Sequence, residues 1–285
     1  MDYKVSIIVP VYNSAQFLNR CLDSLICQTL SDIEIICVND GSTDDSLEIL
    51  ESYANQDSRI KIITQENRGL SCARNCGIKN ASAKYIGLVD SDDFVDKNFF
   101  EKLYNTAEKT SADIVCAGVV RENEKKQKIL LSYKDTVLTC QTLRKMNLAG
   151  VPEHCYSWNK LYRTELIKSV EFKAGVLYED VIFTPQIIEK SKILAVVPNT
   201  YYHYWKHSGS LIKIDSDKAR FDKYVAHEFL NEICERYKLK NSNNYEFKED
   251  IFFCGIKILR IYQYKMTKKY YLFDLIKIGQ KVRRV

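Results

Sequence analysis

The chain has 285 residues, of which 46% are hydrophobic and 28% are charged. These values are ordinary for a soluble globular protein, and the length allows one large domain or one domain with an extension. The sequence contains no run of about 18 apolar residues, which excludes a transmembrane helix. The N-terminus lacks a basic region followed by a cleavable apolar stretch, so we expect a cytoplasmic protein rather than a secreted one.

The net charge of +5 is concentrated at one end. Residues 257–285 carry nine Lys or Arg and one acid, a net +8, so residues 1–256 carry −3. Aromatic residues interleave with these basic ones, a pattern that favours peripheral contact with an anionic membrane surface. An ordinary solvated helix is the alternative. Nucleic acid is the other anionic partner, but no nucleic-acid-binding module occurs, so we predict no nucleic-acid binding.

The ten cysteines are scattered, and no CxxC pair occurs. Several lie inside apolar runs, such as Cys37 in the segment 35–38. Buried free thiols behave as small hydrophobic residues. We interpret the cysteines as structural thiols in a reducing compartment.

Strand-like and helix-like segments alternate along the first two thirds of the chain. Apolar runs predict strands at 5–9 (ending at Pro10), 33–38, 60–64, 85–89, 114–120 and 193–197. Helical spacing predicts helices near 17–26, 44–53, 70–80, 97–109, 181–190, 217–238 and 246–265, with a polar hairpin tip at 122–128. Alternation of this kind indicates βαβ units, and so an α/β fold with a mostly parallel sheet flanked by helices.

Polar residues follow three of the predicted strands. They are Tyr12 and Asn13, Asp40, and the run Asp90-Ser91-Asp92-Asp93. Ligands of open parallel sheets bind beyond the carboxyl ends of the strands, so these residues should meet in one crevice.

Three carboxylates within four residues make the 90–93 run the most informative of these. Such crowding is unfavourable unless a cation is present. Hard oxygen ligands suit Mg²⁺ or Mn²⁺, which pair with phosphates. The sequence therefore indicates a metal–nucleotide site, and a solvated acidic turn is the alternative.

Several ordered segments resemble family 2 glycosyltransferases. They are 5–13, 38–44, 67–77, 90–93, the bacterial-type run Trp158–Tyr162 and the late acidic pair Glu179–Asp180. The resemblance spans about residues 5–210. It implies a GT-A (Rossmann-like) catalytic domain over residues 1–212, and we expect a helical, basic C-terminal extension over 213–285.

The resemblance also implies an activity. It is the inverting transfer of a sugar, a hexosyl or N-acetylhexosaminyl group, from a UDP-sugar to a hydroxyl. We expect the acceptor to be a bacterial surface glycan, lipid-linked where the tail meets a membrane. A non-catalytic nucleotide-sugar-binding protein on the same fold is the alternative.

The roles of individual residues follow from the same resemblance. Asp180 is the expected general base, with Glu179 orienting it or holding the acceptor. Asp92 is the main metal ligand, Asp90 binds the ribose or assists the metal, and His207 completes the metal shell for Mn²⁺ or Mg²⁺. The residues expected to bind the nucleotide sugar are Pro10, Val11, Tyr12, Asn13, Asp40, Gly69, Arg74, Asp90, Ser91 and Lys206.

Two further residues have competing interpretations. Asp93 is expected to be structural, capping the helix near Lys97. Trp158 either stacks on the acceptor sugar or fills the core.

Overall fold

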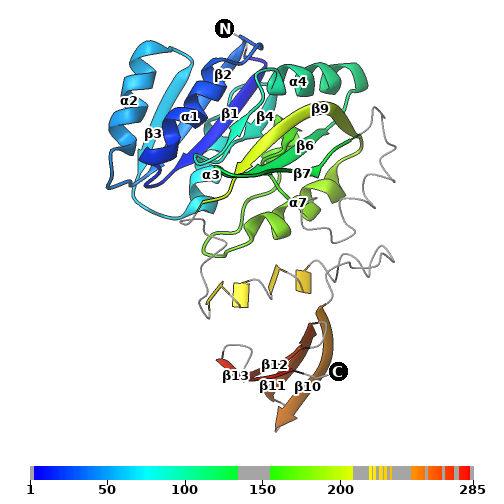
Figure 1. Ribbon diagram of the computed structural model, residues 1–285. Coiled ribbons are helices and arrows are strands. Elements are labelled where there is room, and N and C mark those ends of the chain that lie inside the picture. The colour runs from blue at the N-terminus through cyan, green and yellow to red at the C-terminus, as the bar shows by residue number, and fades with distance from the viewer. Residues whose placement is uncertain are drawn as a thin grey trace.

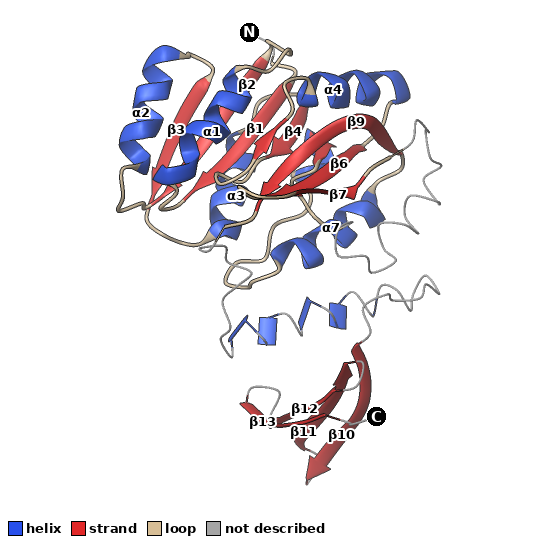
Figure 2. Cartoon of the chain, viewed as in Figure 1, coloured by secondary structure: helices blue, strands red, loops and turns tan. Residues whose placement is uncertain are grey.

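The computed structural model describes residues 3–133 and 155–207, short helical pieces between 218 and 232, and the strands between 245 and 282 (Figure 1). The described residues between 3 and 207 form one sheet of nine strands. Helices pack against this sheet, as Figure 2 shows. The strand order is β3-β2-β1-β4-β8-β6-β9-β5, and β7 pairs with β6.

The first half of the sheet is parallel. It consists of β1 (Val5–Val11), β2 (Ile33–Asp40), β3 (Ile60–Gln65) and β4 (Tyr85–Leu88). Every residue of β1 and β2 is buried, as expected for strands covered on both faces. The intervening helices are α1 (Ala15–Ile26), α2 (Ser46–Gln56) and α3 (Leu70–Asn80), so the βαβ prediction is confirmed for this half.

Helix α3 approaches β1 closely because it carries a glycine at the contact. A Cβ at Gly77 would lie 2.2 Å from Cγ2 of Ile8. This close approach places Arg74, one turn earlier on α3, near the carboxyl end of the sheet.

Beyond β4 the sheet is mixed. Strand β8 (Lys160–Arg163) is antiparallel to both β4 and β6 (Ile114–Glu122), while β9 (Leu194–Trp205) is parallel to β6. The short β5 (Phe94–Val95) and β7 (Gln127–Leu131) pair antiparallel with β9 and β6. Helices α4 (Phe99–Thr110), α6 (Thr164–Ile167) and α7 (Glu179–Lys190) accompany this half. The sequence patterns did not predict β5 or β8, which have only two and four residues.

One boundary differs from prediction, at the end of the first strand. Strand β1 continues through Pro10 to Val11 instead of ending at the proline. Its pairing with β4 ends at Ile8 and Leu88, so Pro10 interrupts no hydrogen bond of that ladder. The exposed hairpin tip is confirmed between β6 and β7, where Asn123 Oδ1 accepts hydrogen bonds from the backbone of Lys125 and Lys126.

The helix predicted over 246–265 is wrong. This region forms β10 (Tyr245–Phe253) and β11 (Ile256–Tyr264), followed by β12 (Thr267–Leu272) and β13 (Ile276–Val282) in an antiparallel sheet. Its isoleucine, tyrosine and phenylalanine content favours strands, and this preference overrides the apolar spacing.

The residues described between 218 and 232 are helical, in line with the helix predicted over 217–238. The domain boundary predicted at 212/213 lies outside the described residues. Within the described part of the chain, no helix has the length and apolar character to cross a membrane.

Candidate active site

Hydrogen bonds connect the loops that follow β1 and β2. Asn13 has a positive φ of 48°, its Oδ1 accepts the Thr43 N–H at 2.8 Å, and its own N–H donates to Ser42 Oγ at 3.1 Å. Pro10 and Val11 are buried within β1. Tyr12 and Asn13, both predicted to bind the nucleotide, are exposed, and 49% of Tyr12 is accessible to solvent. The loops therefore form a rigid base that presents an aromatic ring to solvent.

Asp40 anchors the loop that leads into α3. Its Oδ1 accepts hydrogen bonds from Gln65 Nε2 at 2.7 Å and Arg68 N at 3.0 Å, and its Oδ2 accepts one from Gly69 N at 2.8 Å. Gly69 has φ 86°, a backbone conformation that glycine adopts without strain. Asp40 and Gly69 thus shape the same corner of the site, and the expected contact with the nucleotide base stays a prediction.

Each carboxylate of the 90–93 run has a different partner. Asp90 Oδ1 accepts Arg74 Nη2 at 2.6 Å, and Asp92 Oδ2 lies 2.8 Å from His207 Nε2. Asp93 accepts Tyr202 Oη at 2.9 Å and Trp205 N at 2.8 Å, so it holds β9 and does not cap the helix near Lys97. Ser91 Oγ, predicted to bind the nucleotide, is buried and lies 2.7 Å from Ser14 Oγ.

Arg74 links the two acidic motifs that the sequence predicted. Its guanidinium is 2% exposed, and it donates to Asp90 through Nη2 and to Glu179 Oε1 through Nη1. Burial lowers the pKa of this arginine, but Asp90 and Glu179 outweigh that effect and raise it. The structure thus places Arg74 between two carboxylates, and its predicted approach to the nucleotide stays a prediction.

Asp180 is the second residue of helix α7 and follows Glu179, a member of this ion pair. Tyr178, which precedes the helix, has φ 64°, and the Val181 N–H donates to Asp180 Oδ1 at 2.9 Å. Burial and the neighbouring Glu179 raise the pKa of Asp180 to about 7, while Arg74 acts in the opposite direction. A carboxyl group with a pKa close to neutrality can accept and release a proton under physiological conditions.

The structure brings together Asp92 and His207, two of the predicted metal ligands. Burial and the charge of Asp90 raise the pKa of Asp92, and His207 partly offsets this. The described residues contain no group of three His, Cys, Asp or Glu side chains arranged around a metal. Mg²⁺ and related ions often use one or two protein carboxylates and complete their shells with phosphates and water, so this donor set fits such an ion.

Two other predicted residues have clear positions. The Lys206 side chain is exposed beside His207. Trp158 is 6% exposed and stacks on Tyr202 at 4.1 Å between ring centroids, so it fills the core.

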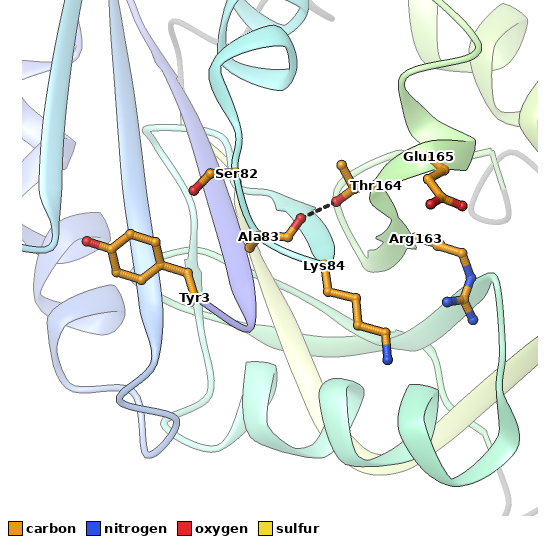
Figure 3. Close-up of a pocket in the computed structure, with 7 residues that line it drawn as sticks. All are labelled: Tyr3, Ser82, Ala83, Lys84, Arg163, Thr164 and Glu165. Carbon is orange, nitrogen blue, oxygen red and sulfur yellow. Dashed lines mark hydrogen bonds between the residues drawn. The ribbon is translucent and has the colours of Figure 1, made fainter. Parts of the chain in front are cut away.

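A surface pocket lies at the amino-terminal ends of β1 and β4, at the opposite edge of the sheet from the residues described above. Figure 3 shows that Tyr3, Lys84, Arg163 and Glu165 are among its lining residues. Lys84 and Arg163 are engaged in ion pairs with Glu108 and Asp113. This pocket is therefore separate from the predicted crevice, which lies beyond the carboxyl ends of the same strands.

The sequence analysis missed Arg20 and Tyr202. Tyr202 Oη accepts the Asp90 N–H at 3.0 Å and donates to Asp93, and Arg20 Nη2 donates to the Asp92 carbonyl at 2.8 Å. Neither lies in an acidic or glycine-rich motif. The single available signal was that Tyr202 belongs to an aromatic-rich strand.

Comparisons with known proteins agree with this fold. The model of glycosyl transferase family 2 matches residues 6–170. The chain is 37% identical over 240 residues to the uncharacterized glycosyltransferase EpsJ of Bacillus subtilis, covering 80% of this chain and 68% of EpsJ. It is 32% identical over 266 residues to glycosyltransferase GlyA of Streptococcus pneumoniae, covering 88% of this chain but only 36% of GlyA.

Among solved structures, residues 1–349 of Staphylococcus aureus TarS in complex with UDP have a TM-score of 0.66 and 22% identity. That match covers 84% of this chain and 68% of the TarS chain. The fold is thus that of the GT-A class. The chain belongs to glycosyl transferase family 2.

Proposed function

We propose that this protein transfers a sugar from a UDP-sugar to a hydroxyl group of a glycan acceptor, with inversion at the anomeric carbon. The observation that carries the proposal is the buried Arg74, which contacts Asp90 and Glu179 at once. It joins the loop after β4 to the start of α7, although these segments lie about ninety residues apart. The predicted donor-binding and base-bearing motifs therefore belong to one site.

Asp180 is the proposed general base. An inverting transfer is a single displacement, in which a carboxylate removes the acceptor proton on one side of the sugar while the diphosphate leaves on the other. The raised pKa of Asp180 suits this role, because an ordinary aspartate is a weaker base. Glu179 is fixed by Arg74, so its proposed role is to orient Asp180 and tune its charge.

Asp92, Asp90 and His207 are the residues that would hold Mn²⁺ or Mg²⁺. Such an ion neutralises the charge that develops on a leaving diphosphate. The carboxylates and the imidazole of this chain supply the protein ligands, and Arg74 limits the freedom of Asp90.

A UDP-sugar is the proposed donor. Tyr12 presents an exposed ring beside the loop that Asp40 holds, where a uracil base can stack. The TarS chains of similar fold are described in complex with UDP and with UDP-GlcNAc. Lys206 is proposed to approach the diphosphate from the end of β9.

The proposed acceptor is a bacterial surface glycan. The relatives include a minor teichoic acid biosynthesis protein of Bacillus subtilis and a poly(ribitol-phosphate) beta-glucosyltransferase of Bacillus spizizenii. The basic segment 257–285 is proposed to contact the inner face of the cell membrane, which would suit a lipid-linked acceptor.

The test is UDP release from a panel of UDP-hexoses and UDP-N-acetylhexosamines with glycan acceptors. We expect Asp180→Asn to lower turnover by about 10²–10⁴-fold, while UDP still binds by calorimetry. Asp32→Asn is the matched control, because Asp32 pairs with Lys4 near the start of β1, at the opposite end of the sheet. Full turnover in Asp180→Asn would refute its role as base, and a product that retains the anomeric configuration would refute inversion. UDP binding without turnover in the unmodified protein would favour a nucleotide-sugar-binding protein instead.

A further inference from the structure

Arg20 of helix α1 is held between two aromatic rings next to the acidic loop. Its guanidinium carbon lies 4.0 Å from the ring centroid of Trp205 and 4.8 Å from that of Phe94. Its Nη2 donates to the carbonyl oxygen of Asp92 at 2.8 Å. Arg20 thus contacts the peptide of Asp92, one proposed metal ligand. It also contacts the ring of Trp205, which lies two positions before His207, the other proposed ligand.

We propose that Arg20 is a positioning residue that holds Asp92 and His207 in one arrangement before the metal and the nucleotide bind. This inference rests on the proposed function, because it assigns Arg20 to the metal ligands of that site. Arg20 has no expected contact with the substrate.

The chemistry of the site favours arginine at this position. A guanidinium is planar, so it can stack on Trp205 and Phe94 while its edge donates to the Asp92 carbonyl. A lysine ammonium would keep the charge but lose the stacked geometry. Burial lowers the pKa of Arg20, and Asp93, Glu122 and Asp92 oppose this effect. The positive charge therefore lies among the carboxylates that would otherwise repel one another.

The two rings are themselves supported. Phe94 stacks on His203 with centroids 4.5 Å apart and an interplanar angle of 8°. His203 Nε2 lies 3.0 Å from Asp96 Oδ1, and its Nδ1 lies 3.2 Å from Glu122 Oε1. The backbone of Trp205 is held by Asp93. These contacts hold the rings of Phe94 and Trp205 in place. The guanidinium that stacks on them therefore has little freedom to follow movements of the loop 90–93.

The experiment measures UDP affinity by calorimetry in Mn²⁺ and in EDTA, and Mn²⁺ binding in the presence of UDP by electron paramagnetic resonance. Neither measurement requires turnover. Loss of an outer partner of a metal ligand lowers metal affinity by about 10–100-fold. We expect a loss of this size in Arg20→Met and a smaller loss in Arg20→Lys, with UDP affinity in EDTA unchanged.

Arg59→Met is the matched control. Arg59 is also half-buried and donates through Nη2 to a backbone carbonyl, that of Ile26 at 2.7 Å. It lies away from the acidic loop, so we expect normal Mn²⁺ binding in Arg59→Met. Suppose that Arg20→Met or Arg20→Lys folds and that Mn²⁺ raises its UDP affinity as much as it does in the unmodified protein. Arg20 then has no positioning role. If the unmodified protein gains no affinity from Mn²⁺, the proposed metal site fails and the role of Arg20 fails with it.

Discussion

The parallel and mixed halves of the sheet hold their loops by different means. In the parallel half, hydroxyl and amide groups of Asn13, Ser42 and Thr43 bond the loops after β1 and β2 to each other. On the side of the mixed half, the corresponding connections are buried ion pairs and aromatic stacks. There, Arg74 of α3 reaches from the parallel half to Asp90 and Glu179. The pKa values of Asp92 and Asp180 are raised in this half.

This difference assigns separate tasks to the two halves. The parallel half presents a fixed surface with an exposed ring, which suits recognition of a flat base. The mixed half keeps carboxylates close together and partly desolvated, which suits proton transfer and cation binding. Substitutions in the parallel half should therefore weaken base recognition, and substitutions in the mixed half should impair proton transfer or cation binding.

The largest effect is expected from Arg74→Met, which removes the connection between the acidic motifs. Leaving one side of a buried ion pair without its partner destabilises a protein by about 3–5 kcal/mol. Urea unfolding would measure the loss. Arg163→Met serves as control, because Arg163 pairs with Asp113 at a more exposed position, where an ion pair contributes about 0–1 kcal/mol. Equal stability of the two variants would show that Arg74 does not hold the halves together.

The next effect is expected from Tyr202→Phe. The lost hydroxyl would leave the Asp90 N–H and one oxygen of Asp93 without a partner, at a cost of about 1–3 kcal/mol. Thermal unfolding would report the change. In Tyr85→Phe the lost partner is Glu108, whose side chain is 37% exposed and can bond water, so that variant should be closer to the unmodified protein. A Tyr202→Phe variant no less stable than Tyr85→Phe would contradict the bridging role.

Much of the parallel half could be predicted from the sequence. Long apolar runs marked β1 and β2, and their polar ends marked Asn13 as a loop residue and Asp40 as the strand end. The mixed half was harder, because β5 and β8 are too short to show a period and depend on pairing with distant strands. Asp92 and Asp180 were found through motifs. The partners Arg20 and Tyr202 were not, because their roles arise only when α1 and β9 meet the loop after β4. Over 246–265, apolar spacing predicted a helix where aromatic and β-branched residues form strands.

A smaller effect is expected from pH, and it separates the two halves directly. Because the pKa of Asp180 is about 7 and the base must be ionised, kcat/KM should fall as pH decreases below 7. The decrease should approach about tenfold for each pH unit. UDP affinity in EDTA, which we propose to depend on the parallel half, should change much less over the same range. If the residual activity of Asp180→Asn shows the same acid limb, another group is responsible for it.

The smallest effect is expected from Tyr12→Ala, in the parallel half. Because the ring is 49% exposed, its loss should leave the free energy of unfolding nearly unchanged. Stacking of two aromatic groups contributes about 0.5–1.5 kcal/mol, so UDP should bind roughly two- to tenfold more weakly. Tyr12→Phe keeps the ring and should bind normally, and Ile129→Ala removes a similarly exposed apolar side chain from the β6–β7 hairpin as a control. Calorimetry with UDP in EDTA makes the measurement independent of Asp92 and His207. Unchanged affinity in Tyr12→Ala would mean that the parallel half recognises the nucleotide through its backbone and Asp40 rather than through this ring.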